Sequence, residues 1–263
     1  MFRTAAFAMT NWIKRWLASP AVDALMQRLA PQFDFIRARL SRSSDLGLRL
    51  TLSVFVFIGA SWLFAGVAED IVTGDPLVEL DLKILRWLQQ HATPGVLQGM
   101  QLVSDAHGPW PISALGLVFA LYLACKRAWT WLGTLMLVLP VGMLFNLVLK
   151  QIFHRGRPVL DEPLLALASY SFPSGHVTAT TLFYGVLAAF LATHTSRLGR
   201  RAGLYVTAAF MVLLVGTTRM YLGAHYFSDV IAAAAWSTAW LVLCLMIKEA
   251  QARRRSAQRS RLA

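Results

Sequence analysis

The sequence predicts an all-α fold: a polytopic membrane protein with six transmembrane helices. The first observation is composition, because the chain of 263 residues is 57% hydrophobic and only 14% charged, too apolar for an ordinary soluble domain of this length. The second is the spacing of charge. Six stretches of 17 to 22 residues contain no charged residue and no histidine: 50–68, 108–125, 128–149, 177–193, 202–218 and 230–247. A helix rises about 1.5 Å per residue, so each stretch matches a hydrocarbon layer about 30 Å thick.

The segments outside these stretches also carry helical patterns. Apolar residues recur at helical spacing within residues 11–40, at Val22, Leu25, Met26 and Leu29. This predicts either an amphipathic helix on the inner membrane surface or a soluble cap. The spacing recurs within residues 77–88, at Leu77, Leu80, Ile84 and Leu88, where we expect an interfacial helix that screens the site or guides lipid toward it. The chain is therefore divided into a cytoplasmic amphipathic segment 1–49, a membrane domain 50–247 and a basic cytoplasmic tail 248–263.

Basic residues fall mainly on one side of the predicted membrane. If the stretches cross alternately, residues 1–49, two short turns and the tail lie together and hold 19 of the 25 basic residues. Basic residues are retained in the cytoplasm, so both termini are predicted to be cytoplasmic. A bacterial inner membrane is the expected location, with a eukaryotic organelle membrane left open. The periplasmic side holds nine of the 13 acidic residues and only six basic ones, including Lys150, Arg155, Arg157 and Arg219. Cations that oppose the topological bias predict an anion site on that side.

The remaining composition excludes several classes of partner. The net charge of +12 is spread over cytoplasmic edges and the tail, so anionic inner-leaflet lipid explains it better than nucleic acid does. Cys125 and Cys244 lie within predicted spans and are expected to be packing residues rather than a disulfide or a metal site. The first apolar run is interrupted by Lys14 and Arg15, unlike a signal peptide, so the first span is expected to direct insertion.

Three spaced groups of polar residues stand in the last two periplasmic connections. The first is Lys150, six residues, then Arg157-Pro158, and the second is Pro173-Ser174-Gly175-His176. The third is Arg219, five residues, His225, three residues, then Asp229. In order and spacing these groups resemble the three signature motifs of the type 2 phosphatidic acid phosphatase family, over residues 50 to 247. Thr218 stands where that family often has serine, and it keeps the hydroxyl.

The residue types alone predict a phosphate site. Lys150, Arg157 and Arg219 supply three cations, and an arginine fork can grip two phosphate oxygens at once. Ser174, Gly175 and His176 open a predicted helix, whose free N–H groups and dipole favour an anion. Gly175 lets the backbone approach that anion closely. We therefore interpret these residues as the phosphate-binding part of the site.

The two histidines of the motifs are candidate catalytic residues. His225 and Asp229 are four residues apart, so their side chains share a face if the helix begins by His225. The carboxylate then accepts from one ring nitrogen and leaves the other unprotonated, able to attack phosphorus and form a phosphohistidine. His176 suits a general acid that protonates the departing oxygen and later deprotonates water. The family resemblance implies the same roles for His225, Asp229 and His176.

Other polar residues receive simpler interpretations. The histidines outside the motifs are interpreted as hydrogen-bonded interfacial residues: His91, His107, His154 and His194. Arg155 is left open between phosphate capture and headgroup contact, and Tyr170 and Tyr221 are interpreted as interfacial packing. The periplasmic connections lack a further close set of Asp, Glu and His, so we expect catalysis without a metal ion or other cofactor.

Four functions of different class are compatible with these motifs. The leading hypothesis is hydrolysis of a lipid phosphate or pyrophosphate, with undecaprenyl pyrophosphate and phosphatidic acid as the expected substrates. The alternative is phosphate transfer to another lipid or sugar acceptor. The third is oxidation of halide with bound vanadate, because vanadium haloperoxidases resemble the same motifs, but those enzymes are soluble and the six spans argue against it. The fourth is a noncatalytic lipid-phosphate binder or transporter, which has no need of a nucleophile and an acid. The motifs read only phosphate, so the lipid tail, the headgroup and the oligomeric state stay open.

Overall fold

The computed structural model describes residues 45–74, 76–158 and 169–262, and these residues form helices joined by short turns. The helices described are α3 (Asp45–Thr73), α4 (Pro76–Gln90), α5 (Pro94–Ala106), α6 (Pro109–Cys125), α7 (Trp129–Phe153), α8 (Gly175–Ala192), α9 (Leu198–Tyr221) and α10 (Phe227–Leu262). The amphipathic pattern predicted within residues 11–40 lies outside this part of the chain. The chain divides into two compact units, residues 1–54 and 55–263, and the candidate site lies in the second.

Five of the described helices are long and apolar enough to cross a membrane. They contain the spans Leu50–Thr73, Trp129–Phe153, Gly175–Ala192, Leu198–Tyr221 and Phe227–Arg255. The predicted span 108–125 corresponds to α6, which follows α5 after a bend of 41°, and the two helices pass the same test only as a pair. The bend occurs at Pro109, which has no N–H to continue α5. The all-α multi-pass fold is therefore confirmed, with five spans or, if the bent pair counts as one, six.

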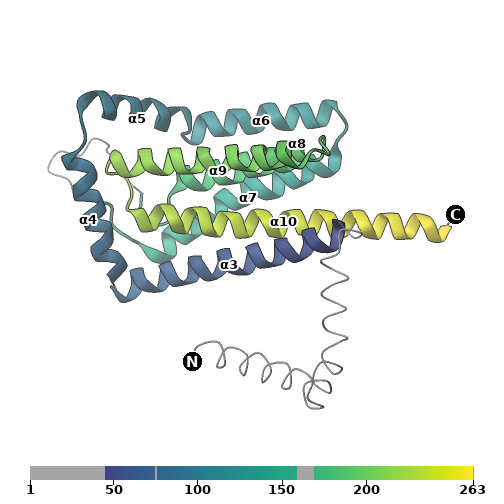
Figure 1. Cartoon of the computed structure of the whole chain (residues 1–263), viewed down its shortest axis with the longest axis horizontal. Helices are drawn as coiled ribbons and strands as arrows, with labels where there is room; N and C mark the ends of the chain where they lie inside the picture. The colour runs from purple at the N-terminus through teal and green to yellow at the C-terminus, as the bar shows by residue number, and fades with distance from the viewer. Residues whose placement is uncertain (1–44, 75, 159–168, 263) are drawn as a thin grey trace, which may run out of the picture. The chain divides into compact units, whose positions relative to one another are not determined.

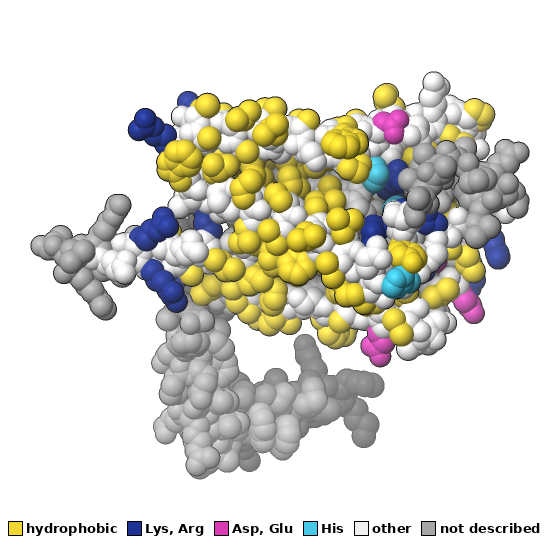
Figure 2. All heavy atoms as spheres, turned by 180° about the vertical axis from the view of Figure 1, so that it is seen from behind, with side chains coloured by type: hydrophobic (Ala, Val, Ile, Leu, Met, Phe, Trp, Pro, Cys, Tyr) yellow, Lys and Arg dark blue, Asp and Glu magenta, His cyan; other side chains and the backbone are white. Residues whose placement is uncertain are grey.

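Helix α8 is the centre of the second unit. Two thirds of its span are buried, at 67%, and α6, α7, α9 and α10 all pack against it. Leu182 and Val186 of α8 are fully buried in one apolar core with Leu135 and Val138 of α7. In Figure 2 apolar side chains cover the middle of the visible face, basic side chains mark the end where α10 finishes, and histidines lie toward the other end. This distribution is typical of a lipid-facing belt between two polar ends.

Close helix contacts around α8 depend on glycine. A Cβ atom on Gly185 would lie 2.2 Å from Leu241 Cδ2, and one on Gly142 would lie 2.4 Å from Leu182 Cδ1. Any side chain at these positions would force the neighbouring leucine to move. Small residues thus let α7, α8 and α10 approach closely, as helices do in lipid, where packing rather than the hydrophobic effect drives association.

Three sequence expectations differ from the structure in detail. Residues 77–88 are helical as predicted, but the buried face of α4 carries Asp81, Leu85 and Leu88, while Leu80 is 42% exposed. Cys125 is exposed at the last residue of α6, so its prediction as a packing residue is wrong, whereas Cys244 is buried. Helix α10 continues unbroken to Leu262, so residues 248–262 extend a span.

Candidate active site

The three motif groups meet at one end of the second unit. Lys150 stands in the last turn of α7, Gly175 begins α8, Arg219 stands in the last turn of α9, and Asp229 stands in the first turn of α10. Because these four helices run alternately in opposite directions, their ends coincide (Figure 1). His176 interacts electrostatically with members of every group, namely Lys150, Arg157, Arg219 and His225. The fold thus gathers the residues that the sequence singles out.

His225 and Asp229 form a buried pair. His225 Nδ1 lies 3.3 Å from Asp229 Oδ2, and the two side chains are 2% and 0% exposed. Helix α10 begins at Phe227 and not by His225 as predicted, but the pair forms because Asp229 Oδ2 also accepts the Tyr226 N–H at 3.0 Å. An ionised carboxylate can only accept, so it selects the tautomer with the proton on Nδ1. His225 Nε2 is then unprotonated, and its lone pair accepts a long hydrogen bond from Arg157 Nη1 at 3.4 Å.

Arg155 supports this pair from the other side. Its Nη1 donates to Asp229 Oδ1 at 2.6 Å and to Ser228 Oγ at 2.7 Å, while its Nη2 donates to Asp81 Oδ2 at 2.8 Å. Its guanidinium carbon lies 4.4 Å from the ring centroid of Tyr226. The guanidinium is thus engaged by two carboxylates and an aromatic face. This contact differs from both roles that the sequence left open, phosphate capture and headgroup contact. Arg155 positions Asp229.

Asp81 of α4 is the residue that sequence reasoning missed. It is 1% exposed, its Oδ1 accepts the Ser228 N–H at 2.9 Å, and its Oδ2 accepts the Ser228 hydroxyl as well as Arg155. The signal was a carboxylate at helical spacing with apolar residues of the amphipathic segment, four positions from Leu77 and four from Leu85. A charged residue on an apolar face needs a buried partner, and Arg155 is that partner.

The other cations are held by neutral acceptors. Arg157 donates from Nε to the Ser169 carbonyl at 2.7 Å and from Nη1 to the Ala224 carbonyl at 2.6 Å, which leaves Nη1 3.4 Å from His225 Nε2. Lys150 Nζ donates to the Tyr170 and Ser171 carbonyls. Carbonyls fix the direction of a cation without neutralising it, so positive charge remains beside the free nitrogen of His225.

Two buried polar atoms at the site are unsatisfied within the described part of the chain. Arg219 donates from Nη1 to Ser104 Oγ at 2.5 Å, but its Nε has no partner, and Ser174 Oγ has none either. Ser174 is the N-cap of α8 and yet makes no side-chain capping bond. Buried polar groups without partners are costly. Phosphate oxygens are acceptors for both a guanidinium N–H and a hydroxyl, so this chemistry fits an anion at the start of α8.

The histidines outside the motifs make mostly local contacts, although His107 Nε2 also lies 3.1 Å from the Tyr184 hydroxyl of α8. His91, His107 and His194 each approach the carbonyl oxygen four residues earlier, within 2.8 to 3.1 Å. His154 caps α7 in the left-handed conformation and packs edge-on against the Tyr170 ring. Their interpretation as hydrogen-bonded residues is confirmed for the first three, whereas His154 is a packing residue. None of these four lies among the contacts of His225 described above.

Burial changes the pKa of His225 and of the arginines beside it. Burial lowers the pKa of His225 to about 4, with Arg157 and Arg219 acting in the same direction against the raising effect of Asp229. Burial also lowers the pKa of Arg157, whereas the two carboxylates outweigh burial and raise the pKa of Arg155. His225 is therefore neutral near pH 7 while all of the arginines stay charged. A neutral imidazole is the nucleophilic form.

No cluster of three or more His, Cys, Asp or Glu side chains able to hold a metal ion occurs among the described residues. Two buried carboxylates at the site, Asp81 and Asp229, are both engaged by Arg155. The donor set at the site consists instead of cations and N–H groups, which suits an anion.

The fold and the site together define a multi-pass helical membrane protein that carries a buried His–Asp pair and a group of cations where four spans end. The sequence model of the PAP2 superfamily matches residues 127–253, which include all three motif groups. These findings confirm the resemblance to the type 2 phosphatidic acid phosphatase family that the motifs indicated.

Individual relatives agree with this assignment. The chain is 41% identical over 104 residues to phosphatidylglycerophosphatase B of Bacillus subtilis (strain 168), a match that covers 39% of this chain and 51% of the relative. The chain thus matches about half the length of that curated relative. It is also similar to the crystal structure of the first transmembrane PAP2 type phosphatidylglycerolphosphate phosphatase from Bacillus subtilis, with a TM-score of 0.67 and 25% identity over 74% of this chain and 96% of the other. Aquifex aeolicus LpxE shares the fold, with a TM-score of 0.50 and 22% identity over 64% and 95% of the two chains.

Proposed function

We propose that the chain is a lipid phosphate phosphatase that hydrolyses a phosphomonoester or pyrophosphate of a membrane lipid through a phosphohistidine at His225. The observation that carries the proposal is the buried His225–Asp229 pair, whose unprotonated Nε2 accepts a long hydrogen bond from Arg157 Nη1 at 3.4 Å. A nucleophile, a residue that fixes its tautomer and uncompensated positive charge are the parts that phosphoryl transfer requires.

The first half-reaction breaks the bond between phosphorus and the lipid oxygen. His225 Nε2 donates its lone pair to phosphorus, and the bond to the departing oxygen breaks as His176 protonates that oxygen. Asp229 stabilises the positive charge that develops on the imidazole. Lys150, Arg157 and Arg219 balance the charge on the phosphoryl oxygens, together with the N–H groups at the start of α8.

The second half-reaction returns the enzyme to its starting state. His176, now neutral, takes a proton from a water molecule whose oxygen attacks phosphorus. The P–N bond to His225 breaks, its electron pair returns to Nε2, and inorganic phosphate is released. No metal ion is required, because the cations of the site carry the electrostatic role.

The distribution of charge supports a periplasmic site in a bacterial inner membrane. Lys126, Arg127, Arg200 and Arg201 lie at the helix ends opposite the motif groups, where the basic end of α10 also lies. Basic residues favour the cytoplasmic side. Both termini are then cytoplasmic, and the substrate enters the site from the outer leaflet.

Substrate choice is best tested with a panel. The sequence favours undecaprenyl pyrophosphate and phosphatidic acid, and the names of the two Bacillus subtilis relatives add phosphatidylglycerophosphate as a candidate. Phosphate release from each lipid, and from lipid A, is measured with detergent-purified protein. His225→Ala should abolish release, whereas His91→Ala, a histidine that bonds only to its own helix, should leave it unchanged. Phosphate recovered on an added lipid or sugar, rather than free, would identify a transferase instead.

A further inference from the structure

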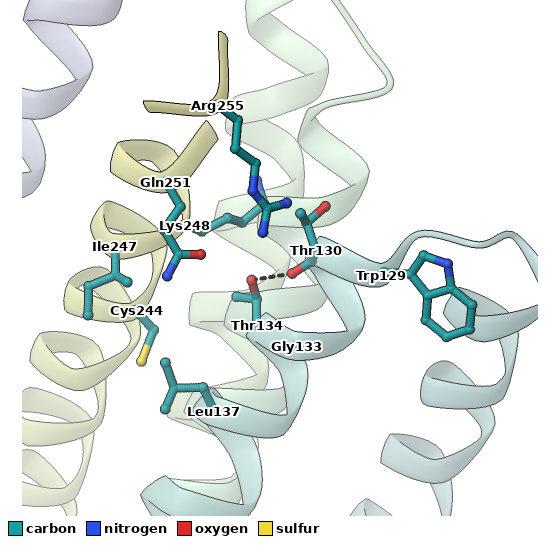
Figure 3. Close-up of a pocket in the computed structure, with 10 residues that line it drawn as sticks. All are labelled: Trp129, Thr130, Gly133, Thr134, Leu137, Cys244, Ile247, Lys248, Gln251 and Arg255. Atoms are coloured by element: carbon teal, nitrogen blue, oxygen red, sulfur yellow. Dashed lines mark hydrogen bonds between the residues drawn. The ribbon is translucent and has the colours of Figure 1, made fainter. Parts of the chain in front are cut away.

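A cavity of about 420 Å³ lies between the first turns of α7 and the second half of α10, at the end of these helices opposite the candidate active site. Its lining changes from apolar to basic along α10, as Figure 3 shows. Residues Cys244, Ile247, Lys248, Gln251 and Arg255 line it from α10, and Trp129, Thr130, Gly133, Thr134 and Leu137 line it from α7. The three polar residues of α10 recur at positions i, i+3 and i+7, which is one helix face.

The two cations of this cavity are not neutralised. Lys248, Gln251 and Arg255 make no hydrogen bond or salt bridge within the part of the chain that the structure describes. Lys248 Nζ instead lies 3.7 Å from the ring centroid of Trp131, a contact that orients an ammonium group and leaves its N–H donors available. In Figure 3 the side chains of Arg255 and Lys248 extend toward Thr130. Glu249, the residue after Lys248 on α10, acts electrostatically on Lys248, but it pairs with Arg253 and does not line the cavity.

We propose that this cavity, formed by Lys248, Gln251 and Arg255 of α10 against the first turns of α7, binds the phosphodiester headgroup of an anionic phospholipid. Two unpaired cations supply the charge that a phosphodiester requires. The apolar lining formed by Leu137 and Ile247 continues from the basic end, and Ile247 is 40% exposed on the span surface, where an acyl chain would lie. A free phosphate ion has the same charged chemistry as the headgroup but no apolar part that could contact Leu137 and Ile247.

The test compares thermal unfolding of detergent-purified protein with added phosphatidylglycerol, phosphatidylcholine or inorganic phosphate. A ligand near 100 times its Kd raises the unfolding temperature of a protein of this size by about 5 to 10 °C. We expect this rise with phosphatidylglycerol and not with phosphatidylcholine, and we expect Lys248→Gln/Arg255→Gln to remove most of it, whereas any rise caused by inorganic phosphate at the candidate active site should be unchanged in this variant. The matched control Arg253→Gln/Arg254→Gln removes the same charge from positions outside the cavity and should keep the rise.

A second variant blocks the cavity without changing charge. A Cβ atom on Gly133 meets no atom within 4 Å, so Gly133→Leu should fill the space and reduce the phosphatidylglycerol shift in a folded protein. Protection by inorganic phosphate that Lys248→Gln/Arg255→Gln removes would overturn the lipid as the occupant. An equal loss in the control double variant, or an unchanged shift in Gly133→Leu, would overturn the site.

The buried carboxylate of Asp81 supports a second inference, which rests on the proposed phosphatase activity. Asp81, Ser228 and Arg155 form a closed set of hydrogen bonds behind Asp229, and the side chains of Asp81 and Asp229 are fully buried. Arg155 thereby shares its charge between two carboxylates. We infer that Asp81 is a positioning residue, which through Arg155 fixes the orientation of Asp229 and limits the positive charge felt by His225.

The groups that act directly on His225 are Asp229 of α10, Arg157 of the connection after α7, Arg219 of α9 and His176 of α8. Arg155 and Lys150 act on Asp229 instead, and Asp81 of α4 acts on Arg155. Asp81→Asn removes one negative charge and leaves that of Arg155 directed at Asp229 alone. The acid limb of kcat/KM should therefore move to lower pH, and kcat should fall about 10- to 100-fold, as for other partners within one network.

The control separates positioning from general stability. Glu79→Gln removes the same charge from the exposed side of α4, where Glu79 pairs only with Lys83, and should leave both kcat and the pH profile unchanged. Should Asp81→Asn fail to fold, Arg155→Lys keeps the charge but not the fork between two carboxylates and should lower kcat with little change in KM. Wild-type kcat in either folded variant would overturn the inference, whereas loss of the proposed function itself would show as no difference between wild type and His225→Ala.

Discussion

Replacing Asp229 with asparagine changes little in shape but alters the proton on His225. The carboxylate accepts from Arg155 Nη1 at 2.6 Å, from the Tyr226 N–H at 3.0 Å and from His225 Nδ1 at 3.3 Å. Asparagine has one oxygen for these three donors. If that oxygen stays on Arg155, the amide N–H₂ faces Nδ1, and the imidazole proton moves to Nε2. The proposed nucleophile then has no free lone pair.

The expected loss of activity follows from catalytic sites with a similar His–Asp pair. Asparagine in place of the aspartate of a Ser–His–Asp triad lowers kcat about 10⁴-fold by imposing the wrong tautomer, and we expect a loss of about 10³- to 10⁴-fold here. Breaking a buried ion pair typically costs about 3 to 5 kcal/mol. Because Asp81 remains as a partner of Arg155, we expect about 3 kcal/mol, which corresponds to a fall of roughly 6 to 12 °C in the unfolding temperature.

The assay is phosphate release by folded Asp229→Asn protein, combined with trapping of phosphohistidine from a labelled substrate. Both signals should be lost together, because the step affected is attack on phosphorus. Glu69→Gln, which removes an exposed carboxylate near the end of α3, serves as the charge-matched control. Activity of folded Asp229→Asn within tenfold of wild type would refute the tautomer argument.

Three further predictions concern pH, packing and metal. Burial lowers the pKa of His225 from 6.5 to about 4, so the unfolded chain takes up the extra proton at a higher pH than the folded protein does. The stability present above pH 6.5 should therefore fall by about 3 kcal/mol between pH 6.5 and 4. A pH series of urea unfolding in which His225→Gln shows the same fall as wild type would contradict this. Gly142→Ala brings a methyl group against Leu182 and Trp240 and should cost about 1 to 3 kcal/mol in thermal unfolding, whereas Gly133→Ala on the same helix meets nothing; equal stabilities would argue against the close contact. A chelator should leave phosphate release unchanged, and a loss that magnesium or zinc restores would show that a metal takes part.

The sequence predicted which residues gather at the site better than it predicted the hydrogen bonds between them. Lys150, His176, Arg219 and Asp229 are all adjacent to charge-free stretches, and alternating spans necessarily bring such ends together. Their spacing also reflects local helix geometry, which a sequence displays directly. The predicted stretch 108–125 coincides with α6, but α6 has only 17 residues, and the bend that joins it to α5 lies just before the stretch, where a count of charge-free residues gives no signal.

The role of Arg155 was not predictable by the same reasoning. Its partners Asp81 and Asp229 each lie 74 residues away in the chain, and no local pattern records a contact between segments so far apart. Asp81 occupies the inward face of α4 only because that face meets the start of α10. The sequence displayed an acidic residue among apolar ones, but only tertiary packing identifies the cation that it holds.

Two buried serines have unsatisfied hydroxyls, and replacing each of them allows an effect on ligand binding to be distinguished from an effect on stability. Ser174 Oγ lies at the start of α8 and Ser237 Oγ lies within α10, and neither has a hydrogen-bond partner in the described chain. Removing an unsatisfied buried hydroxyl should leave stability unchanged or raise it slightly. Both Ser174→Ala and Ser237→Ala should therefore unfold at or just above the wild-type temperature.

The two variants should differ in binding phosphate. If the Ser174 hydroxyl donates to a phosphate oxygen, its loss removes one hydrogen bond of about 0.5 to 1.5 kcal/mol, so inorganic phosphate should inhibit Ser174→Ala about 2- to 12-fold more weakly. Ser237→Ala should keep the wild-type inhibition constant, because that hydroxyl lies away from the motif groups. Identical inhibition constants in the two variants would mean that the unsatisfied hydroxyl at the start of α8 is not part of the anion site.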